Sequence, residues 1–156
     1  MNVEHINPFI EASKTVMKTV ANIDVSLGRV YLKTSPYSSE TLVVVVGLMG
    51  ELRGQVIFSM DKNVAFKIAS AMMMGMSITK LDEMSKSAIA ESTNMILGNA
   101  ATLFYNRGIN IQITPPSLMM GNNIQISTPN MKILSIPLIL STGGKIEMDI
   151  ALAEAV

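Results

Sequence analysis

Apolar residues recur at helical spacing in three stretches of the chain. The first predicted helix opens at Asn7-Pro8, where a proline is tolerated, and runs to about residue 22. A second begins after a predicted N-cap at Asp61 and ends near residue 72. The third is the longest: it follows Thr79 and Asp82, which resemble a capping box, and continues to about residue 106, with Gly108 as its stop.

Between and after the helices, the pattern changes to one typical of strands. Residues 40–49 are almost continuously apolar, which predicts a strand buried on both faces. A turn is predicted at 35–39 and a hairpin across 141–144. Pro137 inside a predicted strand indicates an edge position or a bulge. The predicted strands are 29–34, 40–49, 55–60, 109–114, 124–127, 132–140 and 145–152.

The two halves of the chain agree when one is shifted by eighty residues. Phe9 aligns with Ile89, Met17 with Leu97, Gly28 with Gly108, Thr34 with Thr114, and Pro36 with Pro116. We therefore expect a single domain over residues 1–156 that contains an internal repeat of roughly 7–60 and 87–153. Each copy would be one long helix followed by three strands. The fold class is then α+β, a mainly antiparallel sheet packed by long helices about a pseudo-twofold axis.

Composition and charge exclude several functions. Acidic and basic residues balance at 12 each, without the basic excess expected of a surface for nucleic acid or an anionic membrane. There is no cysteine, so disulfides and thiolate chemistry are excluded. The N-terminus lacks the pattern of a signal peptide, and the longest apolar run, 42–49, is too short to span a bilayer. We expect a soluble, cytoplasmic protein.

Fourteen methionines are an unusual number for this length. They could form an adaptable binding surface or fill gaps in the core. Their apolar sequence neighbours favour the core.

The third helix carries the candidate chemistry. With Ile89 placed at zero on a helical wheel, Ser87, Glu91, Asn94 and Gly98 fall near the opposite pole. Asparagine is a poor residue for a helix interior, which suggests a use for Asn94. The alternative is an ordinary solvated surface, which is the interpretation favoured for the aligned Glu11 and Lys14 of the first helix. The buried stripe should contain Ile89, Thr93, Ile96, Leu97, Ala100, Leu103 and Phe104.

These residues resemble the motif of the CheC/CheX/FliY phosphatases of bacterial chemotaxis. That motif is Asp or Ser, three residues, Glu, two residues, Asn, and then Pro after about twenty-two more. Ser87, Glu91 and Asn94 fit it, and Pro116 follows after twenty-one residues, one short. The duplicated architecture is also CheC-like. Because a single motif is present, on the second long helix, the chain resembles the CheX type, whose members form dimers through their sheets.

The resemblance implies an enzyme that removes phosphate from the aspartyl-phosphate of a CheY-like response regulator. Asn94 would position the attacking water, and Glu91 would pair with a lysine of the receiver domain. Ser87, Gly98 and Asn99 would be supporting positions. The resemblance implies no cofactor or metal in this chain, Mg²⁺ in the partner's active site, and a homodimer.

Other functions have less support from the residues. Only one histidine is present, the acidic residues show no metal-ligand spacing, and no nucleic-acid or membrane partner is indicated. Gly47, Gly50 and Gly54 lack the Gly-Lys-Ser/Thr of a phosphate loop and are interpreted as hairpin glycines. The serious alternative is a non-catalytic interaction module, such as an adaptor or a flagellar-switch-like scaffold.

Overall fold

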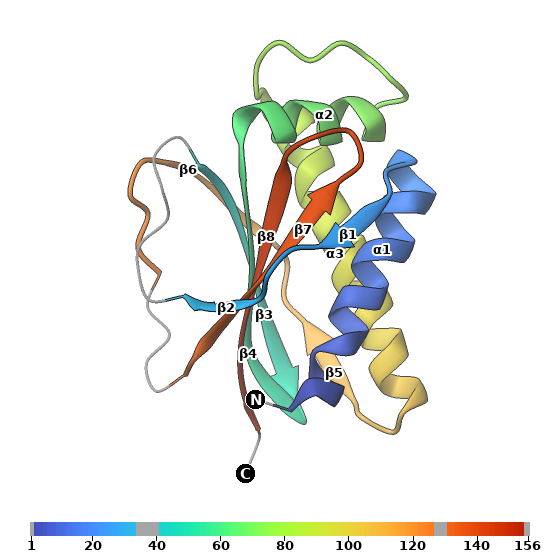
Figure 1. The fold of residues 1–156 in the computed structure, drawn as a ribbon, viewed down its shortest axis with the longest axis vertical. Coiled ribbons are helices and arrows are strands. Elements are labelled where there is room, and N and C mark those ends of the chain that lie inside the picture. The colour runs from blue at the N-terminus through green and yellow to red at the C-terminus, as the bar shows by residue number, and fades with distance from the viewer. Residues whose placement is uncertain (1, 34–40, 127–130, 155–156) are drawn as a thin grey trace.

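The computed structural model describes residues 2–33, 41–126 and 131–154, in which three helices pack on one face of a curved sheet (Figure 1). The helices are α1 (Asn7–Ala21), α2 (Lys62–Met72) and α3 (Glu83–Asn106), and a short 3₁₀ turn, η1 (Val3–His5), precedes α1. These bounds confirm the three helices predicted from the spacing of apolar residues. The predicted N-cap is also confirmed, because the Asp61 carboxylate accepts a hydrogen bond from the Val64 N–H at 2.9 Å.

The predicted capping box ahead of α3 is wrong. Asp82 is itself the N-cap: its Oδ1 accepts from the Ser85 N–H at 2.9 Å and from the Ser85 hydroxyl at 2.8 Å. These two bonds hold the pKa of the Asp82 carboxyl below its ordinary value. Aspartate is as good an N-cap as threonine, so the pattern alone could not choose between Thr79 and Asp82.

In the described part of the chain, eight strands form the sheet, in the order β1-β7-β8-β4-β3-β5, with β2 also pairing β7 and β6 also pairing β3. All the pairings are antiparallel. The first half of the chain contributes four strands instead of the three predicted there, and the second half contributes four, of which β6 is not at the predicted position. The strands are β1 (Val25–Leu27), β2 (Tyr31–Lys33), β3 (Thr41–Gly50), β4 (Leu52–Asp61), β5 (Ile111–Ile113), β6 (Ser117–Gly121), β7 (Ile133–Leu140) and β8 (Lys145–Glu154).

These differences from the predicted strands arise because both outer strands are interrupted. Between Leu27↔Leu138 and Tyr31↔Ser135, the three residues 28–30 lie opposite only two residues of β7. Pro137 is one of those two, and its carbonyl accepts from the Gly28 N–H at 2.9 Å. A bulge therefore lies opposite Pro137, in the outer strand, while β7 itself pairs with β8 without interruption. The predicted edge position is wrong, since β7 lies between β8 and the outer strands.

In the second half, Pro115-Pro116 separates β5 from β6, a strand that the sequence pattern missed. The predicted strand at 124–127 is wrong over 124–126, which are not strand, and Ser127 lies outside the described residues. The predicted turn at 35–39 also lies outside them. Prolines end the β5 ladder because they have no N–H to donate, and the chain resumes pairing one residue later.

The strand order relates the two halves of the chain. β4 and β8 pair at the centre, β1 and β2 of the first half pair with β7 of the second, and β5 and β6 of the second pair with β3 of the first. Exchanging the halves leaves this order unchanged. We infer a duplicated unit whose pseudo-twofold axis passes between β4 and β8.

The main core fills the space between the sheet and the helices. α1 and α3 run antiparallel, so Phe9 near the start of one meets Phe104 near the end of the other, with ring centroids 5.3 Å apart. Alternate residues of β3 point to opposite faces: Val44 joins the main core, and Val43 joins a smaller cluster with Ile57 on the far face. This confirms that β3 is buried on both sides.

The methionines do not mainly fill the core. Met17, Met60 and Met148 are buried, and Met72 and Met95 pack against the core from the edge. The prediction that methionines fill the core was wrong for the exposed ones. Apolar neighbours in sequence do not ensure burial at a sheet edge or between helices. The exposed methionines are Met49, Met74, Met76, Met84, Met119 and Met120.

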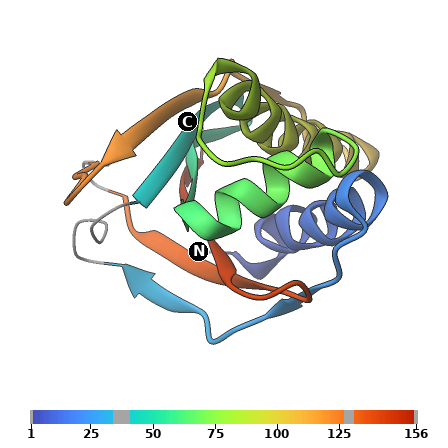
Figure 2. The same cartoon turned by 90° about the horizontal axis from the view of Figure 1, so that it is seen from above.

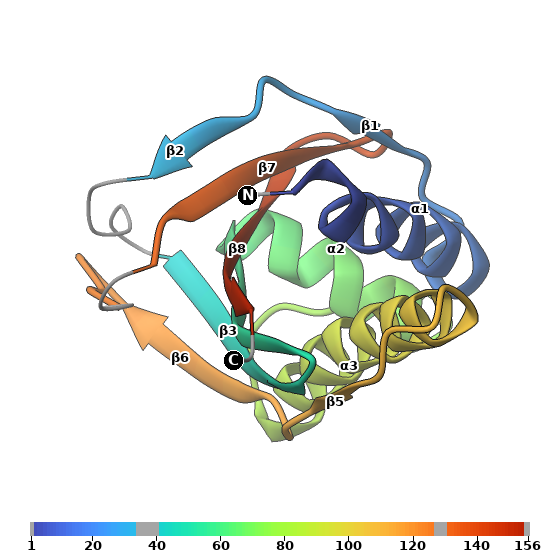
Figure 3. The ribbon, with the colours of Figure 1, turned by 90° about the horizontal axis from the view of Figure 1, so that it is seen from below.

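The sheet curves away from the helices, so that β2 and β6 at its two ends bend toward the far face (Figures 2 and 3). On that face the Lys33 ammonium lies 2.7 Å from Glu147 and 2.9 Å from the fully buried Asp149. The lysine side chain is only 9% exposed. Its ammonium therefore ties β2 to β8 across β7, at a place where an unpaired charge is costly.

Replacing Lys33 by Met should lower the free energy of unfolding by about 3 kcal/mol at neutral pH, because it removes the buried ammonium that lies against Asp149 and Glu147. Glu147 keeps its second ion pair, with Lys145 at 3.2 Å. Burial opposes the charge of Lys33, but the two carboxylates outweigh it and raise the pKa of the ammonium above its ordinary 10.5. Burial likewise opposes the charge of Glu147, but Lys33, Tyr31 and Lys145 together outweigh it and lower the pKa of the carboxyl below 4.5. The contribution of these ion pairs to the free energy of unfolding should be largest at pH values between the two pKa values. It should decrease as pH falls through the lowered pKa of Glu147, and as pH rises through the raised pKa of Lys33.

Denaturant unfolding of wild type and Lys33→Met at about pH 7 and about pH 3 checks this expectation. The gap in stability between the two proteins should shrink at the acidic pH. An equal gap at both would show that the variant loses packing rather than an ion pair.

Candidate functional site

The outer face of α3 is determined by its buried face. Ile89, Leu97 and Ala100 are fully buried against the sheet and α1, and they leave the opposite side of the helix to solvent. Ser87 and Glu91 are exposed there, and Asn94 is half-buried. The predicted buried stripe is confirmed, except that Leu103 is only partly buried.

A hollow of about 450 Å³ lies beside this face. α3 forms one wall with Ser87, Ala90, Glu91 and Asn94. The end of β5 and the residues that follow form the other wall, and Figure 3 shows this segment running alongside the helix. The facing residues are Ile113, Thr114, Pro115 and Pro116.

The structure brings together four of the residues that the family motif singles out: Ser87, Glu91, Asn94 and Pro116. Gly98 and Asn99 do not line the hollow. Gly98 lies one turn beyond Asn94, and a Cβ added to it would meet nothing within 4 Å. Because no side chain projects from the outer face of α3 at this point, another molecule can approach the helix backbone closely.

The hollow has a distinctive chemical character. Among the described residues that line it, Glu91 is the only charged one. Asn94 contributes a neutral carboxamide that can both donate and accept hydrogen bonds. Pro115 and Pro116 present no backbone N–H, so the facing wall offers no amide donor there. The arrangement can hold a water molecule and meet a cationic partner, without an acid–base pair of its own.

Sequence reasoning missed Thr114 and Ile113 as lining residues. The agreement of Thr34 with Thr114 in the internal repeat was a signal, but it did not indicate which side chain faces α3. Gly47 was misinterpreted as a hairpin glycine. It lies inside β3, and its N–H donates to the Thr114 hydroxyl at 2.8 Å.

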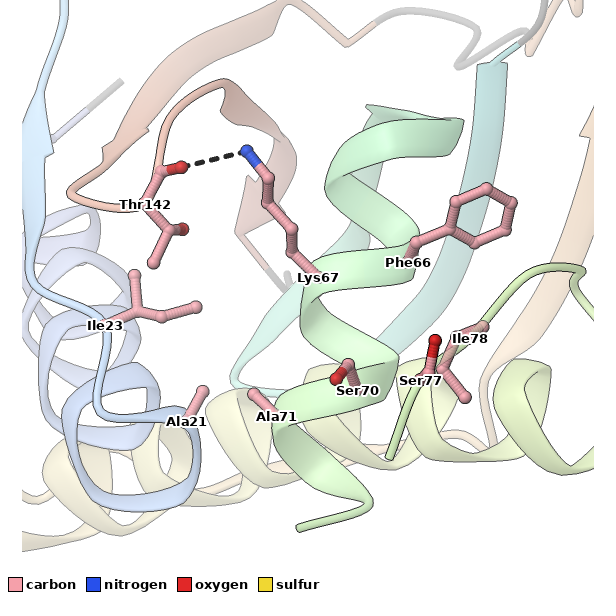
Figure 4. Close-up of a pocket in the computed structure, with 9 residues that line it drawn as sticks. All are labelled: Ala21, Ile23, Phe66, Lys67, Ser70, Ala71, Ser77, Ile78 and Thr142. Atoms are coloured by element: carbon pink, nitrogen blue, oxygen red, sulfur yellow. Dashed lines mark hydrogen bonds between the residues drawn. The ribbon is translucent and has the colours of Figure 1, made fainter. Parts of the chain in front are cut away.

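A second hollow of about 380 Å³ lies where α2 approaches the end of α1 and the β7–β8 turn (Figure 4). Lys67 points toward the turn and donates to the Thr142 carbonyl at 2.8 Å, while Phe66 points to the other side of α2. Its walls are mostly apolar and small, including Ala21, Ile23 and Ala71. It presents neither a carboxylate nor a carboxamide.

Within the described residues, no cluster of three or more histidine or acidic side chains could hold a metal ion. No helix in the same part of the chain is long and apolar enough to cross a membrane.

The counterpart face on α1 has a different character. Glu11 and Lys14 are exposed, and Lys18 forms an ion pair with Asp24 at 3.2 Å between two well-exposed side chains. Exposed pairs of this kind contribute little to stability. The face of α1 carries both signs of charge, and among the α-helices of the described residues only α3 presents a carboxylate followed one turn later by a carboxamide.

The fold and the site together define a class: helix-and-sheet proteins whose long central helix carries an outward Glu-x-x-Asn beside a proline wall. Residues 42–139 match the family described as chemotaxis phosphatase CheX. The CheY-P phosphatase CheX of Thermotoga maritima is 31% identical over 138 residues, 88% of each chain. The chain therefore belongs to the CheX family of chemotaxis phosphatases.

Solved structures agree with this assignment. CheX from Desulfovibrio desulfuricans superimposes with a TM-score of 0.84 at 28% identity, covering 96% of this chain and 99% of that one. CheX in the CheX–CheY–BeF₃–Mg²⁺ complex of Borrelia burgdorferi superimposes with a TM-score of 0.80 at 30% identity, covering 98% and 100%. The α+β, CheC-like fold expected from the sequence is thereby confirmed.

Replacing Gly98 by Ala should stabilise the protein by up to about 1 kcal/mol, because glycine is a poor helix former and the added methyl meets nothing inside the molecule. Gly108→Ala is the matched control. Gly108 has φ +81, so a side chain there should destabilise by about 1 kcal/mol. Thermal unfolding of both variants tests the pair. A destabilised Gly98→Ala protein would mean that the outer face is not open.

Proposed function

We propose that this protein hydrolyses the aspartyl-phosphate of a CheY-like response regulator in bacterial chemotaxis, with Asn94 and Glu91 as its principal site residues. The observation that carries the proposal is that both side chains border one hollow on the outer face of α3, in a member of the CheX family. The name of the Thermotoga relative and the Borrelia complex support CheY as the kind of partner.

The reaction asks little of the phosphatase. An acyl phosphate is reactive, and the water oxygen must bond to phosphorus in line as the bond from phosphorus to the carboxyl oxygen breaks. The products are the free carboxylate of the receiver and inorganic phosphate. Positioning that water is enough to accelerate the step. An uncharged carboxamide suits this task because it does not repel the phosphoryl oxygens.

Glu91 would dock the partner. Its carboxylate is exposed and is the only charge among the described lining residues, so a lysine of the receiver can pair with it at a small desolvation penalty. Ser87 is a supporting position at the edge of the same hollow. Gly98 and Asn99 would support docking from outside it, Gly98 by leaving room for the partner's backbone.

The chemistry requires no cofactor in this chain. We propose that Mg²⁺ is held by the receiver, where it would neutralise the phosphoryl charge, and that the enzyme acts in the cytoplasm. A non-catalytic interaction module remains the alternative. A substoichiometric amount of the protein should shorten the lifetime of the phosphorylated receiver if the proposal holds, whereas a module would act only in stoichiometric amounts.

Asn94→Ala should lower kcat for phosphate release by about a hundredfold or more, because the water loses its positioning group while the docking surface remains. Glu91→Lys should mainly raise KM, since two like charges would meet at the interface. Phosphate release from receivers phosphorylated with a small phosphodonor measures both effects, with Asn94→Ala also tested for binding to the receiver.

The first helix supplies the matched control for this experiment. Glu11→Lys makes the same charge reversal at the aligned, exposed position of α1. It should leave both kcat and KM near the wild-type values. Full activity in the Asn94 and Glu91 variants would remove these residues from the mechanism, and no acceleration by wild type on any receiver would favour the interaction module.

We also propose a homodimer formed through the ends of the sheet. The outer strands carry exposed apolar side chains: Leu32 on β2 is 57% exposed, and Met120 on β6 is 42% exposed. Light scattering at micromolar concentration should give twice the chain mass. Leu32→Lys and Met120→Lys test the two edges separately, and the variant that becomes monomeric identifies the interface. A monomeric wild type would contradict the proposal.

A further inference from the structure

One residue of the wall that faces Asn94 contacts β3 in the gap between the β5 and β6 ladders. β3 pairs with β6 up to Val45↔Ser117 and with β5 from Leu48↔Ile113. Between them, residues 114–116 cross only two positions of β3. Since Pro115 and Pro116 have no N–H, they cannot continue the ladder. Between the two ladders, this segment is therefore hydrogen-bonded to β3 through Thr114.

Thr114 uses both backbone polar groups of Gly47. Its N–H donates to the Gly47 carbonyl at 3.0 Å, and its Oγ1 accepts from the Gly47 N–H at 2.8 Å. The hydroxyl also lies 3.4 Å from the Pro115 carbonyl, to which it can donate its own proton. These contacts, called here the Gly47–Thr114 clasp, fix the side chain of Thr114 and the first peptide of the wall.

The clasp requires a glycine at position 47 because a larger side chain would collide with Thr114, and not because the backbone there has a conformation that only glycine adopts. A Cβ added to Gly47 would lie 3.0 Å from Thr114 Cγ2 and 3.2 Å from Oγ1. Gly47 is not among the described residues with positive φ, so alanine can adopt its backbone conformation. Alanine at this position should therefore push Thr114 and the attached wall away from β3.

We propose that Thr114 and Gly47 are positioning residues of the phosphatase. The clasp sets the gap between the proline wall and Asn94, and thus where the phosphoryl group of the receiver lies relative to the water. This inference rests on the proposed function. α3 is anchored separately by its buried stripe, so loosening the clasp moves the wall and leaves the helix in place. A shift of about 1 Å in such a gap is enough to lower a rate by up to about a hundredfold.

The geometry of the two outer strands provides a matched control. Gly28 lies between β1 and β2, at the opposite end of the sheet, and it too lies close to a neighbouring strand. A Cβ added to it would lie 2.9 Å from the Pro137 side chain. Gly28 does not line the hollow. Gly47→Ala and Gly28→Ala therefore make the same chemical change at two crowded strand junctions, of which one faces Asn94.

The experiment measures kcat and KM for phosphate release from the phosphorylated receiver, below the unfolding transition of every variant. Gly47→Ala and Thr114→Val should lower kcat by about ten- to a hundredfold with KM within about threefold of wild type, because docking through Glu91 is unchanged. Thr114→Ser keeps the hydroxyl and should retain most of the activity. It should also rescue Gly47→Ala, since it removes the Cγ2 methyl that the alanine meets.

Each contrary result overturns the inference. An equal loss of kcat in Gly47→Ala and Gly28→Ala would show that the clasp contributes only to packing. A raised KM with unchanged kcat would show that it contributes to docking of the receiver. Loss in Thr114→Ser equal to that in Thr114→Val would exclude the hydroxyl. If wild type is active, Asn94→Ala is inactive and the clasp variants keep full activity, this inference is wrong while the proposed function stands. An inactive wild type would overturn the proposed function, and this inference with it.

Discussion

The burial of one stripe of α3 is the constraint on which the rest of the site depends. Ile89, Ile96 and Leu97 lie at 0–2% exposure against the sheet and α1, so the helix cannot rotate without exposing them. Because residues half a turn away must then face outward, Glu91 and Asn94 are held at the surface by the core. The outer face is a consequence of packing on the inner one, and the site needs no strained backbone on α3.

The second wall of the hollow has a different origin. It comes from residues 113–116, which are joined to the sheet through β3 of the first half of the chain. The exchange of outer strands between the halves is what brings this segment to α3. The site is therefore composite: one wall is a helix face, and the other is a break in the sheet. Two prolines cause that break, and the same two residues deprive the wall of backbone donors.

The far face of the sheet follows a different principle from the near one. The near face buries aliphatic and aromatic side chains against the helices, whereas the far face combines a small apolar cluster around Val43 and Ile57 with a buried cation between two carboxylates. A buried ion pair is weak evidence for stability, but it specifies pairing, because any shift of β2 would leave buried charges apart. The outer strand is short and interrupted, and this ion pair holds it in register.

The helices, the central strands, the family and the residues on the outer pole of α3 could all be predicted from the amino-acid sequence, because each depends on spacing along the chain. The N-cap of α3 is also a local feature, and it was missed because Thr79 and Asp82 are both good capping residues. Residue identities could not show where β6 forms or which methionines are exposed, since these depend on neighbours distant in sequence. The same holds for the hollow. Ser87, Glu91 and Asn94 were identifiable from a helical wheel, while Thr114 and Gly47 lie 67 positions apart and meet only through the strand pairing of β3 with β5. Local periodicity carries no information about such a contact, and the tertiary structure alone decides it.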